Sequence, residues 1–349
     1  MSLFVTKFSL HKDRRVDLGL PKDLPPPQMS AAHKDEKTVD SKSAKMAYGI
    51  HMPIAQQSPT FVQPWEASCG PEEMRQIAMR CDARGFLYLA VSDHVGVPRD
   101  LVPHMSATWY DPVATLAWLG SATCRVRLMA YVSVLPYRHP LQTAKSYATL
   151  DCLTGGRVIL GVGAGHAQKE FEALGLDFSK RGKMLEEAIG CVEQAFREDY
   201  PEHDGEFWSY KDLGQQPRPV QVDGPPIWVG GSSRAAMRRA AELADGWLPQ
   251  GPPAMGMAHA IEFLHERRAN SNRTKPLEIG GMALDAYVGE PSHAVADKVL
   301  TGRPERMAEF MHENARAGCT HMGIRLHVRD ADEMLDQIDA FSEEVAVLL

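Results

Sequence analysis

The stretch Arg157–Phe171, "RVILGVGAGHAQKEF", contains a short apolar run, a turn with alternate glycines and the beginning of a helix. This order is typical of one strand–helix unit of an α/β protein. The glycines at 161, 163 and 165 do not form a dinucleotide-binding fingerprint, because His166 stands where that motif has its third glycine. Two interpretations stay open here. The strand end simply needs small residues, or bare backbone lets a flat ring or a phosphate approach closely.

The same alternation of strand and helix extends over the chain from residue 45 onward. Strand-like apolar runs are predicted at 45–54, 86–95, 125–136, 158–165, 227–231, 245–251, 278–289 and 321–328. Helices are predicted to follow them at 70–85, 111–123, 139–157, 181–196, 233–244, 254–269, 304–317 and 331–348. Eight such units favour a closed (β/α)₈ TIM barrel over an open doubly wound sheet, which more often stops at about six strands. The irregular stretch 198–226 is then an insertion after the fourth unit.

Residues 1–44 differ from the rest, since they are rich in Pro, Lys, Asp and Ser and have no period. We interpret them as a flexible N-terminal extension that orders against a neighbouring subunit, or as an expression leader. The barrel domain is predicted to cover residues 45–349.

Composition excludes several classes of function. The net charge of −7 argues against nucleic acid as the main partner. No apolar run approaches the roughly 18 residues of a membrane span, and the N-terminus lacks the pattern of a signal peptide. Six cysteines are scattered without a CxxC pair, which indicates free thiols in a reducing compartment. We therefore expect a cytoplasmic protein that acts on a small molecule.

The active site of a barrel lies at the carboxyl ends of its strands, so residues that follow each predicted strand are the candidates. Asp93 and His94 follow the second strand, where an imidazole beside a carboxylate can act as general acid or base. A structural Asp–His pair is the alternative. His166, two loops away, is the candidate partner for a second proton or charge role.

The segment "WVGGSSRAAMRR" opens a predicted helix with two glycines and two serines. Free backbone N–H groups and the helix dipole there favour a phosphate seat, and a plain serine N-cap is the alternative. A bulge in "YVSVLP" would push backbone against a ligand. Strand one ends with the single His51, and no two histidines are spaced for joint ligation, so no metal site is predicted. A metal hydrolase is the disfavoured alternative.

Three segments together resemble the luciferase-like monooxygenase superfamily, and within it the branch that uses the deazaflavin coenzyme F420. They are "AVSDHVGVP", the long run from "VSVLPYRHP" through "LDCLTGGRVILGVGAGHAQKEF" to "KMLEEAI", and "PPIWVGGSSRAAMRRAAELADGWLP". The resemblance extends from about residue 46 to 348, and it includes the order and the spacing of the motifs as well as the motifs themselves. These segments discriminate poorly between the flavin and deazaflavin branches.

The resemblance implies roles for individual residues. It implies a non-prolyl cis peptide bond at Ser133–Val134, against which the cofactor ring would lie. Asp93 would contact the deazaflavin, His94 would face the substrate, and Gly230 and Gly231 would hold the cofactor phosphate. A related sugar-phosphate dehydrogenase has a Glu acid where this chain has His166, which argues against the same sugar substrate. The catalytic candidates are His94, His166 and Asp93; the predicted cofactor contacts are Asp93, Ser133, Val134, Gly163, Ala164, Gly165, His166, Val229, Gly230, Gly231 and Ser232.

The resemblance thus implies an F420-dependent oxidoreductase that moves a hydride between C5 of the deazaflavin and a small organic substrate. An FMN-dependent luciferase-like monooxygenase is the alternative, and a family member that binds a flavin-like ligand without turnover is a third possibility. A homodimer or higher homo-oligomer is expected by analogy with the family.

Overall fold

The computed structural model describes residues 46–59 and 61–349 of the chain. In this part of the chain one parallel sheet has the strand order β11-β10-β12-β1-β2-β3-β4-β7-β8-β9. Its strands are β1 (Ala47–His51), β2 (Tyr88–Val91), β3 (Arg127–Val134), β4 (Val158–Gly163), β7 (Ile227–Gly230), β8 (Gly246–Leu248), β9 (Glu278–Ile279), β10 (Leu284–Val288), β11 (Leu300–Gly302) and β12 (His321–Leu326).

The sheet closes on itself between β9 and β12. Gly280, directly after β9, forms a parallel bridge with His321 at the start of β12. The N–H of Gly281 donates to the carbonyl of His321 at 2.7 Å, and the N–H of Thr320 donates to the carbonyl of Ile279 at 2.8 Å. A ring of eight strands results, β12-β1-β2-β3-β4-β7-β8-β9, which confirms the predicted (β/α)₈ barrel for the described residues.

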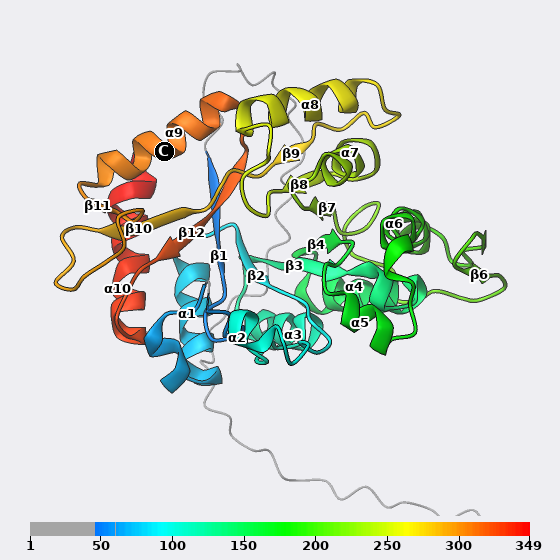
Figure 1. Cartoon of the computed structure of the whole chain (residues 1–349), viewed down its shortest axis with the longest axis horizontal. Helices are drawn as coiled ribbons and strands as arrows, with labels where there is room; N and C mark the ends of the chain where they lie inside the picture. Colours follow the sequence, from blue (N-terminus) through cyan, green and yellow to red (C-terminus); the bar gives the residue numbers. More distant parts are fainter. Residues whose placement is uncertain (1–45, 60) are drawn as a thin grey trace, which may run out of the picture. The chain divides into compact units, whose positions relative to one another are not determined.

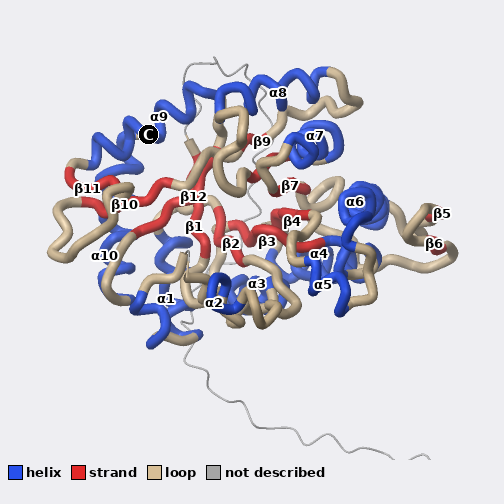
Figure 2. The backbone as a smooth tube through the Cα atoms, viewed as in Figure 1, coloured by secondary structure: helices blue, strands red, loops and turns tan. Residues whose placement is uncertain are grey.

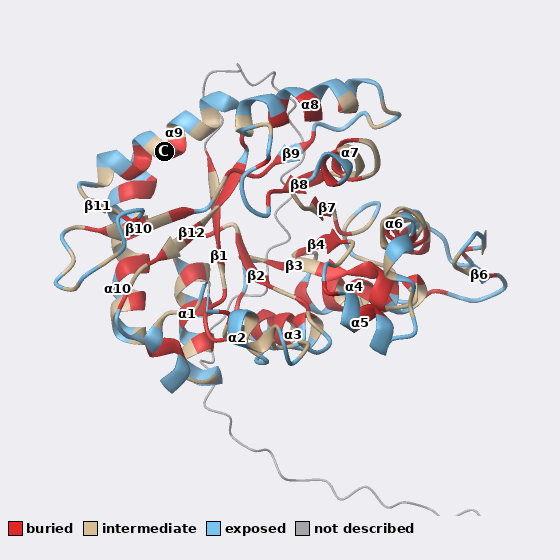
Figure 3. Ribbon diagram, viewed as in Figure 1, coloured by how far each residue is buried: buried red, intermediate tan, exposed pale blue. Residues whose placement is uncertain are grey.

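Helices surround this ring (Figures 1 and 2). They carry a buried stripe toward the strands and an exposed outer face (Figure 3), as expected for amphipathic helices that cover a sheet. The helices are α1 (Pro71–Ala83), α2 (Val102–Met105), α3 (Pro112–Ala122), α4 (Pro140–Thr154), α5 (Gln168–Ala173), α6 (Arg181–Arg197), α7 (Arg234–Leu243), α8 (Met257–Ala269), α9 (Pro304–Ala317) and α10 (Ala331–Ala340).

The barrel interior is filled by large side chains that lie over glycines of the neighbouring strand. A Cβ on Gly49 of β1 would lie 2.3 Å from the ring of Tyr88 on β2, and one on Gly246 of β8 would lie 2.5 Å from the ring of Trp228 on β7. Glycine is therefore needed at both positions, because interiors this dense leave no room for an extra methyl group. Tyr88 and Trp228 belong to an inner cluster that is separate from the larger core between strands and helices.

Two details differ from the sequence-based expectation. The run expected as one seventh strand, 278–289, is divided into β9 and β10 at the glycine pair 280–281, since β9 pairs with β8 while β10 pairs with β12. The predicted insertion 198–226 carries a small antiparallel hairpin of β5 (His203–Asp204) and β6 (Ser209–Tyr210).

The expected N-terminal extension, residues 1–44, lies outside the described residues. Among the described helices none is long and apolar enough to cross a membrane.

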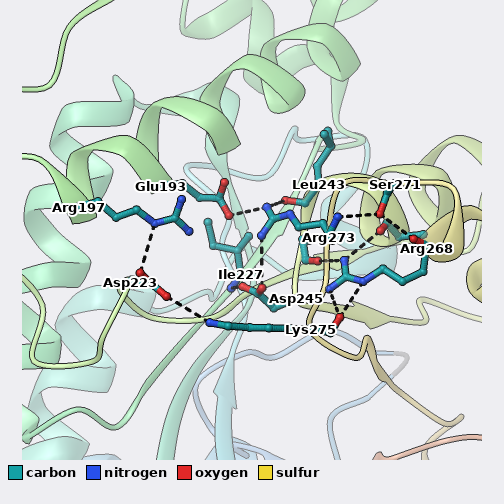
Figure 4. Close-up of polar contacts among 12 residues, drawn as sticks. Glu193, Arg197, Asp223, Ile227, Leu243, Asp245, Arg268, Ser271, Arg273 and Lys275 are labelled. Atoms are coloured by element: carbon teal, nitrogen blue, oxygen red, sulfur yellow. Dashed lines mark hydrogen bonds and ion pairs between the residues drawn. The ribbon is translucent and has the colours of Figure 1, made fainter.

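Two arginines tie the elements together at the end of the barrel where β7, β8 and β9 begin (Figure 4). Arg273 contacts Glu193 of α6 at 2.5 Å and Asp245 at 3.4 Å, and it donates to the carbonyl of Leu243. Asp245 in turn accepts a hydrogen bond from the N–H of Ile227 at 2.9 Å. These contacts stabilise the amino ends of β7, β8 and β9, which lie opposite the carboxyl ends of the strands.

The second arginine, Arg268 of α8, is 8% exposed and donates to three carbonyls. Its guanidinium reaches Ala241 at 3.0 Å and Ala244 at 2.6 Å, at the end of α7, and Lys275 at 2.7 Å. The bonds to Ala241 and Ala244 satisfy carbonyls that the end of α7 leaves without an intrahelical partner.

Arg268→Met is expected to lower the free energy of unfolding by about 3 kcal/mol, because it leaves buried carbonyls without a donor. Urea unfolding followed by circular dichroism measures this change. The matched control is Arg267→Met, one residue away, whose side chain is 43% exposed and pairs with Glu242 at 3.3 Å. The control should change stability by less than about 1 kcal/mol. Equal losses in both variants would contradict the role of Arg268.

Candidate active site

A cavity of about 1210 Å³ opens at the carboxyl ends of the strands. A barrel places its active site at this face, and the volume is ample for a cofactor together with a small substrate. Ten of the twelve residues predicted as site residues line this cavity: Asp93, His94, Val134, Gly163, Ala164, Gly165, His166, Gly230, Gly231 and Ser232.

The two other predicted residues lie elsewhere. Val229 is fully buried in the core between strands and helices. Side chains alternate along a strand, and in β7 Trp228 takes the inner face, so Val229 points outward and not into the cavity. Ser133 is also buried outside the cavity lining, and its hydroxyl lies 3.4 Å from Asp93.

The expected bulge is present in β3, but the cis peptide bond is not at Ser133–Val134. It joins Tyr131 and Val132, two residues earlier. The pairing of β3 with β4 shifts register between Ala130 and Ser133, and Ser133 and Val134 are again paired in register with β4. The irregular part of the strand therefore ends before the bond that the family resemblance had implied.

Val132, in this bulge, points between two glycines of neighbouring strands. A Cβ on Gly163 of β4 or on Gly230 of β7 would lie 2.6 Å from a methyl carbon of Val132. The glycines at these strand ends therefore make room for the side chain of Val132 at the wall of the cavity.

Asp93 anchors β3 directly after this bulge. Its carboxylate accepts a hydrogen bond from the N–H of Val134 at 3.0 Å and a two-point contact from Arg138 at 2.5 and 2.9 Å. Burial lowers the pKa of the Arg138 guanidinium, but the hydrogen bonds to Asp93 outweigh this effect and raise it. A paired, buried carboxylate of this kind holds the bulge in place. A direct contact between Asp93 and a cofactor stays a prediction.

His94 is held by a residue that the sequence analysis did not select, Glu170 of α5. Nδ1 of His94 lies 2.9 Å from Oε2 of Glu170. The same carboxylate accepts hydrogen bonds from the N–H groups of Val95 and Gly96 at 2.9 and 3.1 Å, and from the hydroxyl of Tyr137 at 3.0 Å. One buried carboxylate thus fixes the loop after β2 and the imidazole that this loop carries.

Glu170 is 2% exposed, yet it stays ionised at neutral pH. Burial raises its pKa, but the hydrogen bonds from His94, Gly96 and Tyr137 lower it further than burial raises it. A carboxylate on Nδ1 favours the tautomer that carries its proton there and leaves Nε2 as the basic nitrogen. The signal in the sequence was a Glu in the first turn of the helix that follows the glycine turn, a position close to the strand ends.

His166 lies beside His94, with 5.4 Å between the ring centroids and the rings nearly perpendicular. Desolvation by the cavity walls lowers the pKa of His166, and the neighbouring His94 lowers it further. His166 is therefore neutral at pH 7. The indole of Trp109 also contacts His94, at 4.4 Å between centroids.

The glycine and serine turn after β7 forms one end of the cavity. Ser233 caps α7 by accepting the N–H of Ala236 at 3.2 Å, so the N-cap interpretation holds for this serine. Ser232 lines the cavity, and its hydroxyl contacts the carbonyl of Gly251 at 2.5 Å. Arg181 and Arg239 line the same end, and the sequence analysis missed both because they come from the first residue of α6 and from α7.

These residues fit an anionic cofactor tail. The guanidinium groups of Arg181 and Arg239, a serine hydroxyl and glycine residues line the cavity beside α7, and Arg239 also pairs with Glu186 at 2.8 Å. The bulge beside them, where Val132 packs against Gly163 and Gly230, offers an apolar wall to a flat ring.

The chain belongs to the luciferase-like monooxygenase family, whose model matches residues 46–346. It is 37% identical over 185 residues to an uncharacterized protein of Mycobacterium tuberculosis, covering 53% of this chain and 63% of that one. It is 34% identical over 186 residues to an F420-dependent glucose-6-phosphate dehydrogenase of Microbacterium testaceum (51% and 52%). It is 28% identical over 204 residues to an FMNH₂-dependent dimethylsulfone monooxygenase of Pseudomonas putida (57% and 56%).

The alignments with these relatives therefore span between about half and two thirds of their length. Among solved structures, the coenzyme F420-dependent tetrahydromethanopterin reductase of Methanopyrus kandleri superposes with a TM-score of 0.68 at 17% identity, over 86% of this chain and 99% of that one. This likeness confirms the fold.

Deep in the cavity lies His321, which is 2% exposed and stacks on Trp228 with 4.4 Å between centroids. Neither ring nitrogen has a hydrogen-bond partner among the described residues. Burial lowers the pKa of His321 to about 3. At pH values between about 3 and 6.5, His321 is therefore protonated in the unfolded chain and neutral in the folded chain.

The free energy of unfolding is therefore expected to fall as the pH is lowered from 6.5 towards 5. His321→Phe keeps the stacked ring, and should reduce this slope by about 1.4 kcal/mol per pH unit. Denaturant unfolding at several pH values measures the slope. His259→Phe, at an exposed histidine of α8, is the control and should leave the slope unchanged. An unchanged slope in His321→Phe would show that His321 is protonated in the folded protein.

Proposed function

We propose that this protein is an oxidoreductase that uses coenzyme F420 and moves a hydride between C5 of the deazaflavin ring and a small organic substrate. The observation that carries the proposal is the His94–Glu170 pair, set at 2.9 Å beside the glycine-lined bulge in a cavity of about 1210 Å³. The F420-dependent relative and the F420-dependent structural neighbour support the choice of cofactor. When bound, F420 supplies a two-electron hydride donor or acceptor.

Within this proposal the chain manages the proton that accompanies the hydride. When a substrate hydroxyl is oxidised to a carbonyl, Nε2 of His94 takes the hydroxyl proton, and in the reverse direction it returns the proton. The ionised Glu170 stabilises the imidazolium that forms. The neutral His166 would donate a hydrogen bond to the substrate oxygen.

The bulge and the turn after β7 would hold the cofactor. Gly163, Ala164 and Gly165 would lie against the ring, with Val134 at its edge. Gly230, Gly231 and Ser232 would receive the phosphate, with Arg181 and Arg239 supplying positive charge. The cytoplasmic location and the homo-oligomer expected from the sequence remain predictions.

Binding of F420 and FMN to the purified protein tests the choice of cofactor. We expect fluorescence titrations to show saturable binding of oxidised F420 that is at least about tenfold tighter than binding of FMN. Gly230→Ala should weaken F420 binding about tenfold, because the added Cβ would collide with Val132 and displace the bulge. Gly190→Ala is the matched control, since a Cβ there meets nothing within 4 Å.

Tight FMN binding without F420 binding would overturn the deazaflavin assignment. The FMNH₂-dependent relative makes oxygen consumption with reduced FMN the next assay in that case. Binding of neither cofactor would contradict both assignments.

The proton-transfer roles are tested with a substrate found by screening alcohols and carbonyl compounds for bleaching or recovery of the F420 absorbance. His94→Gln should lower turnover about 100-fold, with F420 affinity unchanged within about threefold. Glu170→Gln should lower turnover about tenfold, because it removes the charge that stabilises the imidazolium. Glu172→Gln, on the exposed side of α5, is the control and should keep full activity. Unchanged turnover in His94→Gln would exclude His94 as the proton-transfer group.

A further inference from the structure

A second group of cations lines the cavity, away from the turn after β7. It consists of Arg325 on β12 and Lys298 just before β11. Figure 1 shows β10 and β11 on one side of the barrel and α6 and α7 on the other. We call Arg325 and Lys298 the second cationic end of the cavity.

One carboxylate faces this pair. Asp285 of β10 lies 3.1 Å from Arg325 and 3.3 Å from Lys298, and Nε2 of His327 contacts it at 2.6 Å. Burial raises the pKa of Asp285, but its contacts with His327, Arg325 and Lys298 lower it to about 2, so it carries a full negative charge. One negative charge against two permanent cations leaves this end of the cavity positive.

The guanidinium of Arg325 is only partly used by the protein. Within residues 46–59 and 61–349 it donates one hydrogen bond, from Nη1 to Asp285 at 3.1 Å. Its central carbon lies over the ring of Phe61, 4.9 Å from the ring centroid. Nε and Nη2 make no hydrogen bond to a described residue, and a planar guanidinium edge of this kind matches a carboxylate or a phosphate.

The charge of the cavity contrasts with that of the chain. The whole chain has a net charge of −7. Among the described residues that line the cavity, four carry a permanent positive charge and two are carboxylates: Arg181, Arg239, Lys298, Arg325, Asp93 and Asp285. Two of these six pair with groups outside the lining, Asp93 with Arg138 and Arg239 with Glu186, so Arg181, Lys298 and Arg325 face the cavity against Asp285 alone. Positive charge that gathers at two separate ends of one cavity in an acidic protein favours two separate anionic groups as ligands.

We propose that Arg325 and Lys298 bind the anionic group of the substrate, a carboxylate or a phosphate ester, while the end at Arg181 and Arg239 binds the cofactor tail. This inference rests on the proposed function, because it takes the reacting centre to lie near His94, between the two ends. The substrate class is then a small organic acid or phosphate ester that also carries a hydroxyl or carbonyl group.

Calorimetric titration of the F420-saturated protein tests this subsite, since the cofactor then occupies the other end. The probes are succinate, methyl phosphate and the neutral succinamide. We expect succinate or methyl phosphate to bind and succinamide not to bind, and the tighter of the two anions identifies the group. Arg325→Gln should weaken anion binding about tenfold, and Lys298→Gln about threefold.

Arg329→Gln is the matched control, because Arg329 follows β12 and pairs with Glu333 without lining the cavity. It should leave anion affinity unchanged. Lys298 has a side chain that is 57% exposed, so Lys298→Gln keeps the test valid if Arg325→Gln fails to fold. Equal anion affinity in wild type and Lys298→Gln, together with equal affinity in a folded Arg325→Gln variant, would overturn the subsite.

The outcomes separate the two proposals. If F420 binds but the anion affinity is the same in the Arg325 and Lys298 variants as in the wild type, the subsite is overturned and the proposed function is unaffected. If F420 does not bind, the same titrations are made on the cofactor-free protein with Arg239→Gln, which weakens the other end. Anion affinity that still depends on Arg325 and Lys298 would then support the subsite while the cofactor assignment fails.

Discussion

Closure of the barrel between β9 and β12 is the constraint on which the rest of the structure depends. The bridge of Gly280 with His321 and the two backbone hydrogen bonds beside it join β9 to β12 and so close the ring of eight strands. A closed parallel ring brings the carboxyl ends of all its strands to one rim, so loops from distant parts of the sequence meet there. An open sheet would separate the loop after β12 from the loops after β7 and β8.

On this rim, two buried carboxylates organise the loops in different ways. Asp93 holds the bulge of β3 through the N–H of Val134 and through Arg138. Glu170 holds the loop after β2 through two N–H groups and the imidazole of His94. Each carboxylate is satisfied by several donors, which is the condition under which a buried charge is stable. The loops of the rim and the imidazole of His94 are therefore held in fixed positions.

The barrel could be predicted from the sequence because apolar strand runs and amphipathic helical segments alternate regularly along the chain. Most of the cavity lining could be predicted as well, because this alternation shows where each strand ends. The partner of His94 could not be predicted in the same way. Glu170 lies 76 positions from His94, and only the folded loops show that the two meet. The position of Val229 outside the cavity lining could have been inferred from the sequence, since alternation along β7 with Trp228 inside already points Val229 outward. The position of the cis bond depends on register within a bulge, which no periodicity encodes.

Val132 fits between Gly163 and Gly230, and this packing has an evolutionary consequence. Three positions on three different strands share one small volume, so none of them can change size alone. A relative with alanine in place of either glycine must shorten the residue at the bulge, and a relative with a larger bulge residue must keep both glycines. The shape of the ring-binding wall is therefore inherited as a unit across β3, β4 and β7, while the loops around it remain free to diverge in substrate choice.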